Sequence, residues 1–197
     1  MSASHSHGEG VPSQWVVRWA HLFAPATRIL DLACGQGRHA RFLAGKGHSL
    51  IACDRDGAAL ASLQGVEGIT PFRADLEDGS AWPFAEGEFG GVVVANYLHR
   101  PLFPAIETSL APGGVLIYET FLLGNERYGK PSNPRFLLER DELLKAFGRS
   151  LVVVGYEQGR IGKGKPALVQ RLCAVRSAHL EHDLEPRDAP DSVKILG

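Results

Sequence analysis

The chain has 197 residues, 44% of them hydrophobic and 22% charged, and this composition excludes a disordered protein, a fibrous protein and a chain with two large domains. Its 21 Lys and Arg and 22 Asp and Glu give a formal charge of -1, which argues against a protein that holds nucleic acid mainly through bulk charge. The charge is uneven, because residues 120–175 carry 10 basic and 5 acidic side chains. We therefore expect an anionic substrate to meet the second half of the fold.

The cysteines and the first residues of the chain indicate the cellular compartment in which the protein is expected. Three cysteines without paired or metal-type spacing indicate neither a disulfide framework nor a metal site. The first residues lack an apolar signal core, and no stretch reaches the roughly 18 apolar residues of a membrane span. We expect a soluble, cytoplasmic protein without membrane contact, with a disordered segment at 1–12, one domain at 13–175 and a tail at 176–197. The sequence indicates no oligomeric state.

Helical and strand patterns alternate along the chain. Aromatic and apolar side chains at helical spacing predict a helix over 14–23. Further helices are expected directly after the glycine turn at 34–37, over 56–65 and over 102–110. Short apolar or β-branched runs predict five strands, at 28–33, 49–54, 69–75, 90–98 and 115–121, with a turn at APGG before the fifth. Strands that alternate with helices in this way form a parallel sheet covered on both faces.

The end of the chain departs from this alternation. After a helix over 139–147, two apolar runs at 151–157 and 167–175 are separated by nine residues, too few for a crossover helix. These runs should form an antiparallel hairpin at one sheet edge. The predicted fold is thus α/β, with a doubly wound, mostly parallel seven-stranded sheet, helices on both faces and a C-terminal antiparallel hairpin.

The turn after the first strand has a nucleotide-binding pattern. Gly35, Gly37 and Ala40 match G-x-G-x-x-G/A, and Asp54 lies 19 residues after Gly35 at the end of the next strand. Asp31, four residues before Gly35, would repel a pyrophosphate but suits a cationic ligand. S-adenosylmethionine carries an ammonium and a sulfonium but no phosphate, so the pattern favours it over NAD. A helix-capping role for Asp31 and Asp54 stays open, because both lie at strand–helix junctions.

A resemblance to the class I, Rossmann-like methyltransferases rests first on ILDLACGQGRHARFLA, which is similar to their motif I. It extends over residues 12–175 through CDRD, ADLED, WPFAEGEFGGVVVANYLH, LAPGG and the C-terminal hairpin. Within this class, YETFLLGNERYGKPSNPRFLL resembles small bacterial enzymes of the tellurite-resistance and thiopurine type. The resemblance implies a Rossmann-like fold, S-adenosylmethionine as cofactor and methyl transfer to a small-molecule acceptor.

The resemblance also implies how the first two strands contact the cofactor. Asp31 would approach the methionine ammonium, while the backbone of Gly35 and Gly37 would line the methionine and ribose. Asp54 would hold the ribose hydroxyls. Because Arg55 and Asp56 follow directly, a displacement of the ribose acid by two positions stays open.

Strands three and four would supply the remaining cofactor contacts. Asp75 would accept a hydrogen bond from the adenine amino group, and the backbone of Leu76 would meet a ring nitrogen. Asn96 would border the reactive methyl group. Asp75 as a simple turn residue is the alternative.

Methyl transfer is an in-line displacement, so the protein must align the nucleophile, exclude water and, where needed, remove one proton. Tyr97, His99 and Glu119 lie at the carboxyl ends of strands four and five and are the candidate catalytic residues. Histidine titrates near neutral pH, so His99 is the candidate base or acceptor-orienting group. A histidine that caps the following helix is the alternative.

The acceptor is expected to contact the segment after the fifth strand. Leu122 to Arg135 is rich in Gly, Asn, Pro and charge, which is typical of lids and acceptor-binding loops, with a solvated connector as the alternative. The predicted substrate-binding residues are Arg100, Arg127, Tyr128 and Lys130. We expect a small, anionic acceptor and no catalytic metal.

Other classes remain as alternatives. The residues 96–99 do not form the Asn/Asp-Pro-Pro-aromatic motif of amino-group methylation, and no Pro-Cys pair exists for attack on a pyrimidine. An RNA methyltransferase would use the basic second half and the loop residues Arg160, Lys163 and Lys165 as its phosphate footprint. A regulator that binds S-adenosylmethionine without catalysis is the third interpretation.

Overall fold

The computed structural model describes residues 10–162 and 166–177. Most of the segment predicted to be disordered (1–12) and of the predicted tail (176–197) lies outside the described residues. No helix in the described part of the chain is long and apolar enough to cross a membrane.

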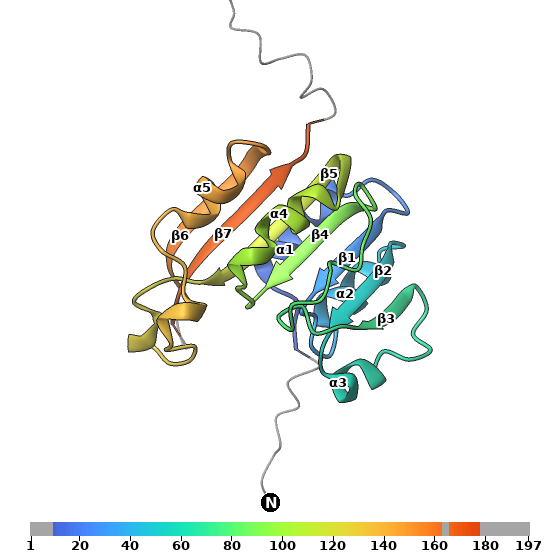
Figure 1. The fold of residues 1–197 in the computed structure, drawn as a ribbon, viewed down its shortest axis with the longest axis horizontal. Coiled ribbons are helices and arrows are strands. Elements are labelled where there is room, and N and C mark those ends of the chain that lie inside the picture. Colours follow the sequence, from blue (N-terminus) through green and yellow to red (C-terminus); the bar gives the residue numbers. More distant parts are fainter. Residues whose placement is uncertain (1–9, 163–165, 178–197) are drawn as a thin grey trace, which may run out of the picture.

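Seven strands form one sheet in the order β3-β2-β1-β4-β5-β7-β6, with helices packed against it (Figure 1). The strands are β1 (Arg28–Leu32), β2 (Ser49–Asp54), β3 (Ile69–Arg73), β4 (Phe89–Ala95), β5 (Leu110–Phe121), β6 (Val152–Ile161) and β7 (Ala167–Val175). The α-helices are α1 (Gln14–Trp19), α2 (Arg38–Ala44), α3 (Gly57–Ala61), α4 (Phe103–Thr108) and α5 (Glu142–Phe147). Short 3-10 turns lie at Ala20–Leu22, Arg100–Leu102, Asn125–Arg127 and Pro134–Phe136.

The strand pairing confirms the predicted fold class. β1 pairs in parallel with β2 and β4, β2 with β3, and β4 with β5. β7 is antiparallel to both β5 and β6. The C-terminal hairpin therefore adds to one edge of the sheet, with β7 between β5 and β6. The strand order therefore changes direction between β1 and β4. In sheets of this kind, ligands bind at the carboxyl ends of the strands at that point.

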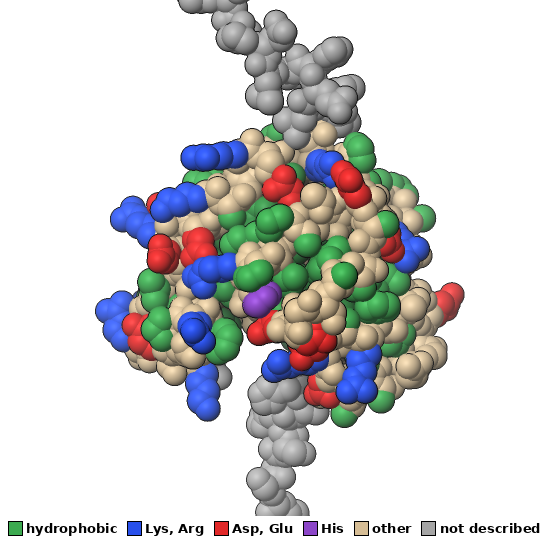
Figure 2. Space-filling model, viewed as in Figure 1, with side chains coloured by type: hydrophobic (Ala, Val, Ile, Leu, Met, Phe, Trp, Pro, Cys, Tyr) green, Lys and Arg blue, Asp and Glu red, His purple; other side chains and the backbone are tan. Residues whose placement is uncertain are grey.

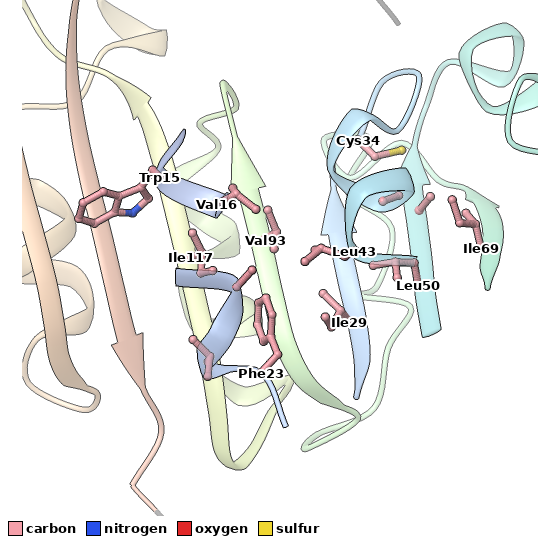
Figure 3. Packing of buried hydrophobic residues seen from close by; sticks show 14 of the residues in the cluster. Trp15, Val16, Phe23, Ile29, Cys34, Leu43, Leu50, Ile69, Val93 and Ile117 are labelled. Atoms are coloured by element: carbon pink, nitrogen blue, oxygen red, sulfur yellow. The ribbon is translucent and has the colours of Figure 1, made fainter. Parts of the chain in front are cut away.

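Two hydrophobic cores cover the two faces of the sheet, because alternate residues of a strand point to opposite sides. Ile29 of β1 packs with buried side chains of α1, α2 and α3, whereas Leu30 packs with those of α4 and α5. Figure 3 shows the first core, where Leu43 of α2 points toward Ile29 and Trp15 of α1 lies against the C-terminal part of the sheet. Helices on both faces, as predicted, hold the strand ends rigidly in place.

Some boundaries differ from the prediction for identifiable reasons. The first helix is α-helical only to Trp19 and tightens into a 3-10 turn before Phe23. β4 ends at Ala95, short of the predicted residue 98, because Asn96 adopts a left-handed backbone with φ 58°. The chain therefore leaves the sheet earlier and exposes residues 96–99 at its edge.

Two strands are longer than predicted. β5 begins at Leu110, which pairs with Phe89 ahead of a register shift, so the predicted APGG turn is an irregular part of the strand. β6 extends to Ile161, because its pairing with β7 continues to Ala167 through residues predicted as loop. The extension of β5 pairs with β4, and the extension of β6 pairs with β7, the other strand of the hairpin.

Candidate functional site

A cavity of about 430 Å³ lies at the carboxyl ends of the parallel strands. The residues after β3 and β4 contribute most of its wall, and the segment between β5 and α5 closes one side. The wall consists of Ala33, Asp54, Arg55, Ala74, Asp75, Leu76, Glu77, Asn96, Tyr97, Leu98, Thr120, Pro131 and Phe136. Figure 2 shows the surface hollowed at its lower edge, with Lys and Arg side chains gathered to the left of the hollow. The cavity has the size and mixed polar and apolar lining of a small-molecule site.

The glycine turn after β1 depends on left-handed backbone. Gly35 and Gly37 have φ values of 56° and 75°, and a Cβ on Gly37 would lie 2.7 Å from the methyl groups of Leu63. Ala33 also adopts a left-handed backbone, with φ 53°, and it is the residue of this turn that lines the cavity. The tight turn therefore places the start of α2 next to the residues that line the cavity. Gly35 and Gly37 themselves are not wall residues.

Asp31 is buried beneath the first turn of α2. Its Oδ2 accepts a hydrogen bond from the Ala40 backbone N–H at 2.9 Å, and its Oδ1 lies 4.0 Å from Nδ1 of His39. Burial raises the pKa of Asp31 to about 7, although the Ala40 hydrogen bond opposes the rise. These contacts match the capping role, and Asp31 does not line the cavity. Its approach to a ligand ammonium stays a prediction.

Asp54 faces the cavity from the end of β2. Its Oδ2 accepts from the Gly35 backbone N–H at 2.7 Å, and its Oδ1 accepts from the Asp56 N–H at 2.9 Å. Asp56 instead caps α3 by accepting from the N–H groups of Ala58 and Ala59, and it is not a wall residue. The geometry therefore favours Asp54 over Asp56 as the acid that meets a ligand.

Asp75 and Leu76 lie together on the cavity wall after β3. Asp75 also has the turn role that was the alternative, because its Oδ1 accepts from the Glu77 N–H at 3.0 Å. Its second oxygen has no hydrogen-bond partner among the described residues, so one side chain is able to hold the turn and still bind a ligand.

Glu77 connects two of the predicted catalytic residues. Its Oε2 lies 3.9 Å from Nδ1 of His99, and its carboxylate is close enough to the Tyr97 hydroxyl to raise the pKa of Tyr97. Burial, followed by the charge of Glu77, raises the pKa of Tyr97 well above its usual value, so Tyr97 stays protonated. Sequence reasoning did not select Glu77. The available signal was its place just after β3, whose carboxyl end meets that of β4 at the same sheet edge.

Glu119 does not reach the cavity. It is buried on the α1 face, with Oε2 2.5 Å from Nε of Arg171, while the next residue, Thr120, lines the cavity. Adjacent residues of a strand point to opposite faces, so only one of these two could enter the site. The predicted catalytic role of Glu119 stays a prediction, whereas Thr120, which the sequence places at the same strand end, is a wall residue.

Arg100 is engaged with protein groups. Its Nε and Nη2 donate to the Glu142 carboxylate at 2.6 and 2.9 Å, and its Nη1 and Nη2 donate to the carbonyls of Arg135 and Leu137, both at 3.0 Å. Arg100 is thus a clamp between the end of β4, α5 and the segment after β5. Its predicted contact with substrate stays a prediction.

The segment 122–138, here called the insert, is an ordered loop. Leu122 and Leu138 form a bridge at its base, and the buried Asn125 accepts from the Leu168 N–H at 3.0 Å and donates to the Pro131 carbonyl at 3.3 Å. The insert contributes Pro131 and Phe136 to the cavity wall. The predicted substrate-binding residues of the insert, Arg127, Tyr128 and Lys130, are absent from that wall.

Comparison with known proteins agrees with the fold and the glycine turn. The family described as "Methyltransferase domain" matches residues 29–114. Trans-aconitate 2-methyltransferase from Variovorax paradoxus is 31% identical over 99 residues, which are 46% of this chain and 37% of that protein. The chain thus matches little more than a third of the length of this relative.

Two solved structures are similar in fold. TehB from Haemophilus influenzae has a TM-score of 0.69 and 16% identity, covering 82% of this chain and 61% of TehB. The 1,6-didemethyltoxoflavin-N1-methyltransferase from Burkholderia thailandensis has a TM-score of 0.60 and 18% identity, covering 83% of this chain and 76% of that one.

The sheet order, the glycine turn and the family match agree with one another. The chain has the Rossmann-like fold of solved methyltransferases, and its residues 29–114 match the methyltransferase domain family.

Proposed function

We propose that the protein transfers a methyl group from S-adenosylmethionine to a small-molecule acceptor by in-line displacement. The observation that carries this proposal is the charge of the main cavity, whose wall holds Asp54, Asp75 and Glu77 against the single cation Arg55. A wall with more carboxylates than cations attracts a ligand that carries ammonium and sulfonium charges and disfavours a pyrophosphate. The residues present therefore fit S-adenosylmethionine better than a dinucleotide.

Three groups would hold the cofactor. Asp54, oriented by the N–H groups of Gly35 and Asp56, would accept from the ribose hydroxyls. Asp75 and the Leu76 backbone would meet the adenine ring, and Asn96 would border the methionine part. When bound, the cofactor supplies an electrophilic methyl group and a neutral thioether leaving group.

The remaining wall would align the acceptor and exclude water. Leu98, Pro131 and Phe136 are apolar and lie together on the side of the insert. His99, with Nδ1 near Glu77, is the group available to take a proton from the acceptor. Alignment in a largely water-free site accounts for most of the rate in such displacements.

A small acceptor is favoured over RNA by the fate of the basic side chains. Arg140 and Arg171, two of the basic side chains of residues 120–175, form ion pairs with Asp141 and Glu119. They contribute less to a phosphate-binding surface than the sequence count suggests. The names of the relatives, which refer to trans-aconitate and a toxoflavin precursor, also support a small acceptor.

Calorimetric titration tests the proposed cofactor. We expect S-adenosylmethionine and S-adenosylhomocysteine to bind and NAD not to bind. Asp54→Asn should weaken cofactor binding at least about tenfold, because hydrogen bonds to a charged acceptor contribute roughly 1.5–3 kcal/mol. Asp56→Asn, which changes a carboxylate two residues away and outside the wall, should change the affinity less than about twofold. Tight NAD binding, or equal effects of the two variants, would contradict the proposal.

Product formation tests the reaction and its acceptor class. The protein is incubated with S-adenosylmethionine and either a panel of small metabolites or bulk RNA, and S-adenosylhomocysteine is measured. We expect product with a small molecule and none above background with RNA. Cofactor binding without product from any acceptor would instead indicate the regulator.

A further inference from the structure

A second cavity, of about 340 Å³, adjoins the main one. Glu77, Leu98 and Phe136 belong to both walls, so the two cavities meet along these residues. The rest of the second wall comes from the start of the 3-10 turn after β4 and from the insert, namely His99, Arg100, Pro101 and Arg135. The cofactor residues Asp54 and Asp75 lie only in the main cavity.

Arg135 is the cation of this second cavity that remains available to a ligand. Arg100 is neutralised by the contacts of its Nε and Nη2 with the Glu142 carboxylate, and Glu77, the carboxylate of this wall, has Oε2 3.9 Å from Nδ1 of His99. Arg135 has no ion-pair partner in the part of the chain that the structure describes. Its guanidinium is therefore free to bind an anionic group of a ligand, most effectively a carboxylate.

The backbone of Arg135 is held in position. Its N–H donates to Oδ1 of Asn133 at 3.0 Å, and its carbonyl accepts from Nη1 of Arg100 at 3.0 Å. The neighbouring Phe136 is 47% exposed although it is a large hydrophobic side chain, and it faces both cavities beside Leu98. An apolar ligand body in the second cavity would cover Phe136.

We propose that the second cavity is the acceptor pocket and that the acceptor is a small molecule with a compact apolar body and a carboxylate bound by Arg135. This inference rests on the proposed function. With the carboxylate at Arg135, a nucleophilic O–H or N–H of the acceptor is directed toward the border with the main cavity. As its lone pair forms the bond to the methyl carbon, its proton passes to His99, and the electrons of the broken C–S bond stay on sulfur. His99 is partly exposed and returns the proton to water.

Binding of benzoate and of its uncharged analogue benzamide tests the pocket. The protein is saturated with S-adenosylhomocysteine, and ¹H–¹⁵N NMR spectra are recorded during titration with each probe. We expect benzoate to shift the amide signals of His99, Arg135 and Phe136 and to bind about fivefold more tightly than benzamide, as for a partly exposed charge pair. Equal binding of the two probes, or shifts that map outside this cavity, would overturn the inference.

Variants at two arginines supply the matched comparison. Arg135→Ala should weaken benzoate binding about fivefold and leave benzamide binding unchanged, and Arg135→Lys should restore part of the loss. Arg149→Ala removes an exposed arginine that lines neither cavity, and it should leave both probes unaffected. If Arg135→Ala behaves like Arg149→Ala while S-adenosylhomocysteine still binds, the acceptor pocket is refuted and the proposed function stands. If S-adenosylhomocysteine does not bind, the proposed function fails and the inference with it.

Discussion

Asp31, which precedes the glycine turn, and His39 of α2 form a buried pair. Through this pair, Asp31 has a structural role at the start of α2. His39 accepts from the Ser13 N–H through Nε2, and its other ring nitrogen lies near Asp31. Burial lowers the pKa of His39 to about 4 and raises that of Asp31 to about 7. Both side chains are therefore uncharged between these values. The pair links the start of α2 to the segment before α1, behind the glycine turn.

The first prediction concerns the pH dependence of stability. A raised folded-state pKa means that Asp31 keeps its proton longer in the folded protein, so its contribution to stability falls as the pH rises from about 4 to about 7. Asp31→Asn cannot ionise, so it removes this fall in stability with pH, and its amide oxygen can still accept from the Ala40 N–H. Relative to the parent protein, its free energy of unfolding should rise by on the order of 2 kcal/mol between pH 5 and pH 7. Urea unfolding at the two pH values measures this difference.

His39 provides the opposite control. Its lowered folded-state pKa means that protonation opposes folding below about pH 6.5, so its contribution to stability rises with pH. His39→Gln should therefore become less stable, relative to the parent, as the pH rises from 5 to 6.5. The same slope for both variants would contradict the assignment of a neutral pair.

Asp31→Asn also tests the predicted contact with the cofactor ammonium. Because Asp31 lies outside the cavity wall and accepts from α2, we expect its replacement to weaken S-adenosylmethionine binding less than Asp54→Asn does. Calorimetry on the two variants at the same pH makes the comparison. A larger loss for Asp31→Asn would restore the interpretation of Asp31 as the main cofactor acid.

At the scale of elements, the insert is a cavity-lining loop that is held by contacts with two other parts of the fold. Asn125, which is 1% exposed, ties it to β7, and the Arg100 clamp ties its far end to α5. A loop held in this way keeps Pro131 and Phe136 at the cavity before any ligand arrives. Preformed walls reduce the ordering that binding would otherwise require.

Asn125→Ala is expected to destabilise the fold by about 2 kcal/mol, because it leaves the partly buried Leu168 N–H without its partner. Hydrogen exchange should become faster over the insert, and urea unfolding gives the free energy. Asn133→Ala removes a capping asparagine from the exposed part of the same loop and should cost no more than about 1 kcal/mol. Equal losses for the two variants would show that Asn125 does not anchor the insert.

At the scale of the whole molecule, α1 joins the beginning of the chain to its end. Trp15 is 2% exposed and donates from Nε1 to the Leu172 carbonyl of β7 at 3.2 Å. Arg18 of the same helix pairs with Glu157 of β6 at 2.8 Å. The helix therefore covers the antiparallel part of the sheet, on the face that also buries Glu119.

Trp15→Ala should lower the free energy of unfolding by about 3–5 kcal/mol, the usual loss for a large aromatic side chain in a core. Val17→Ala on the same helix changes a residue that is 38% exposed and should cost less than about 1 kcal/mol. Urea unfolding of both variants checks the comparison. A small loss for Trp15→Ala would mean that α1 does not hold the C-terminal strands in place.

Much of the fold and part of the site could be predicted from the order of residues. Apolar runs, glycines and their spacing predicted the mostly parallel sheet, the terminal hairpin and the polar residues at the strand ends. Asp54, Asp75, Leu76, Asn96 and Tyr97 share one cavity because carboxyl ends of parallel strands meet at one sheet edge. That rule needs only local patterns and the handedness of crossovers.

Which distant partner each of several polar side chains meets was decided by the tertiary structure alone. Glu119 and Thr120 are adjacent in sequence, but the pairing of β5 with β7 places the first opposite Arg171, while the second lines the cavity. Arg100 meets Glu142 across 42 residues, and Glu77 meets His99 across the ends of two strands. A charge pattern shows which side chains are able to bind an anion, whereas contacts between distant segments determine which of them are already neutralised by the protein.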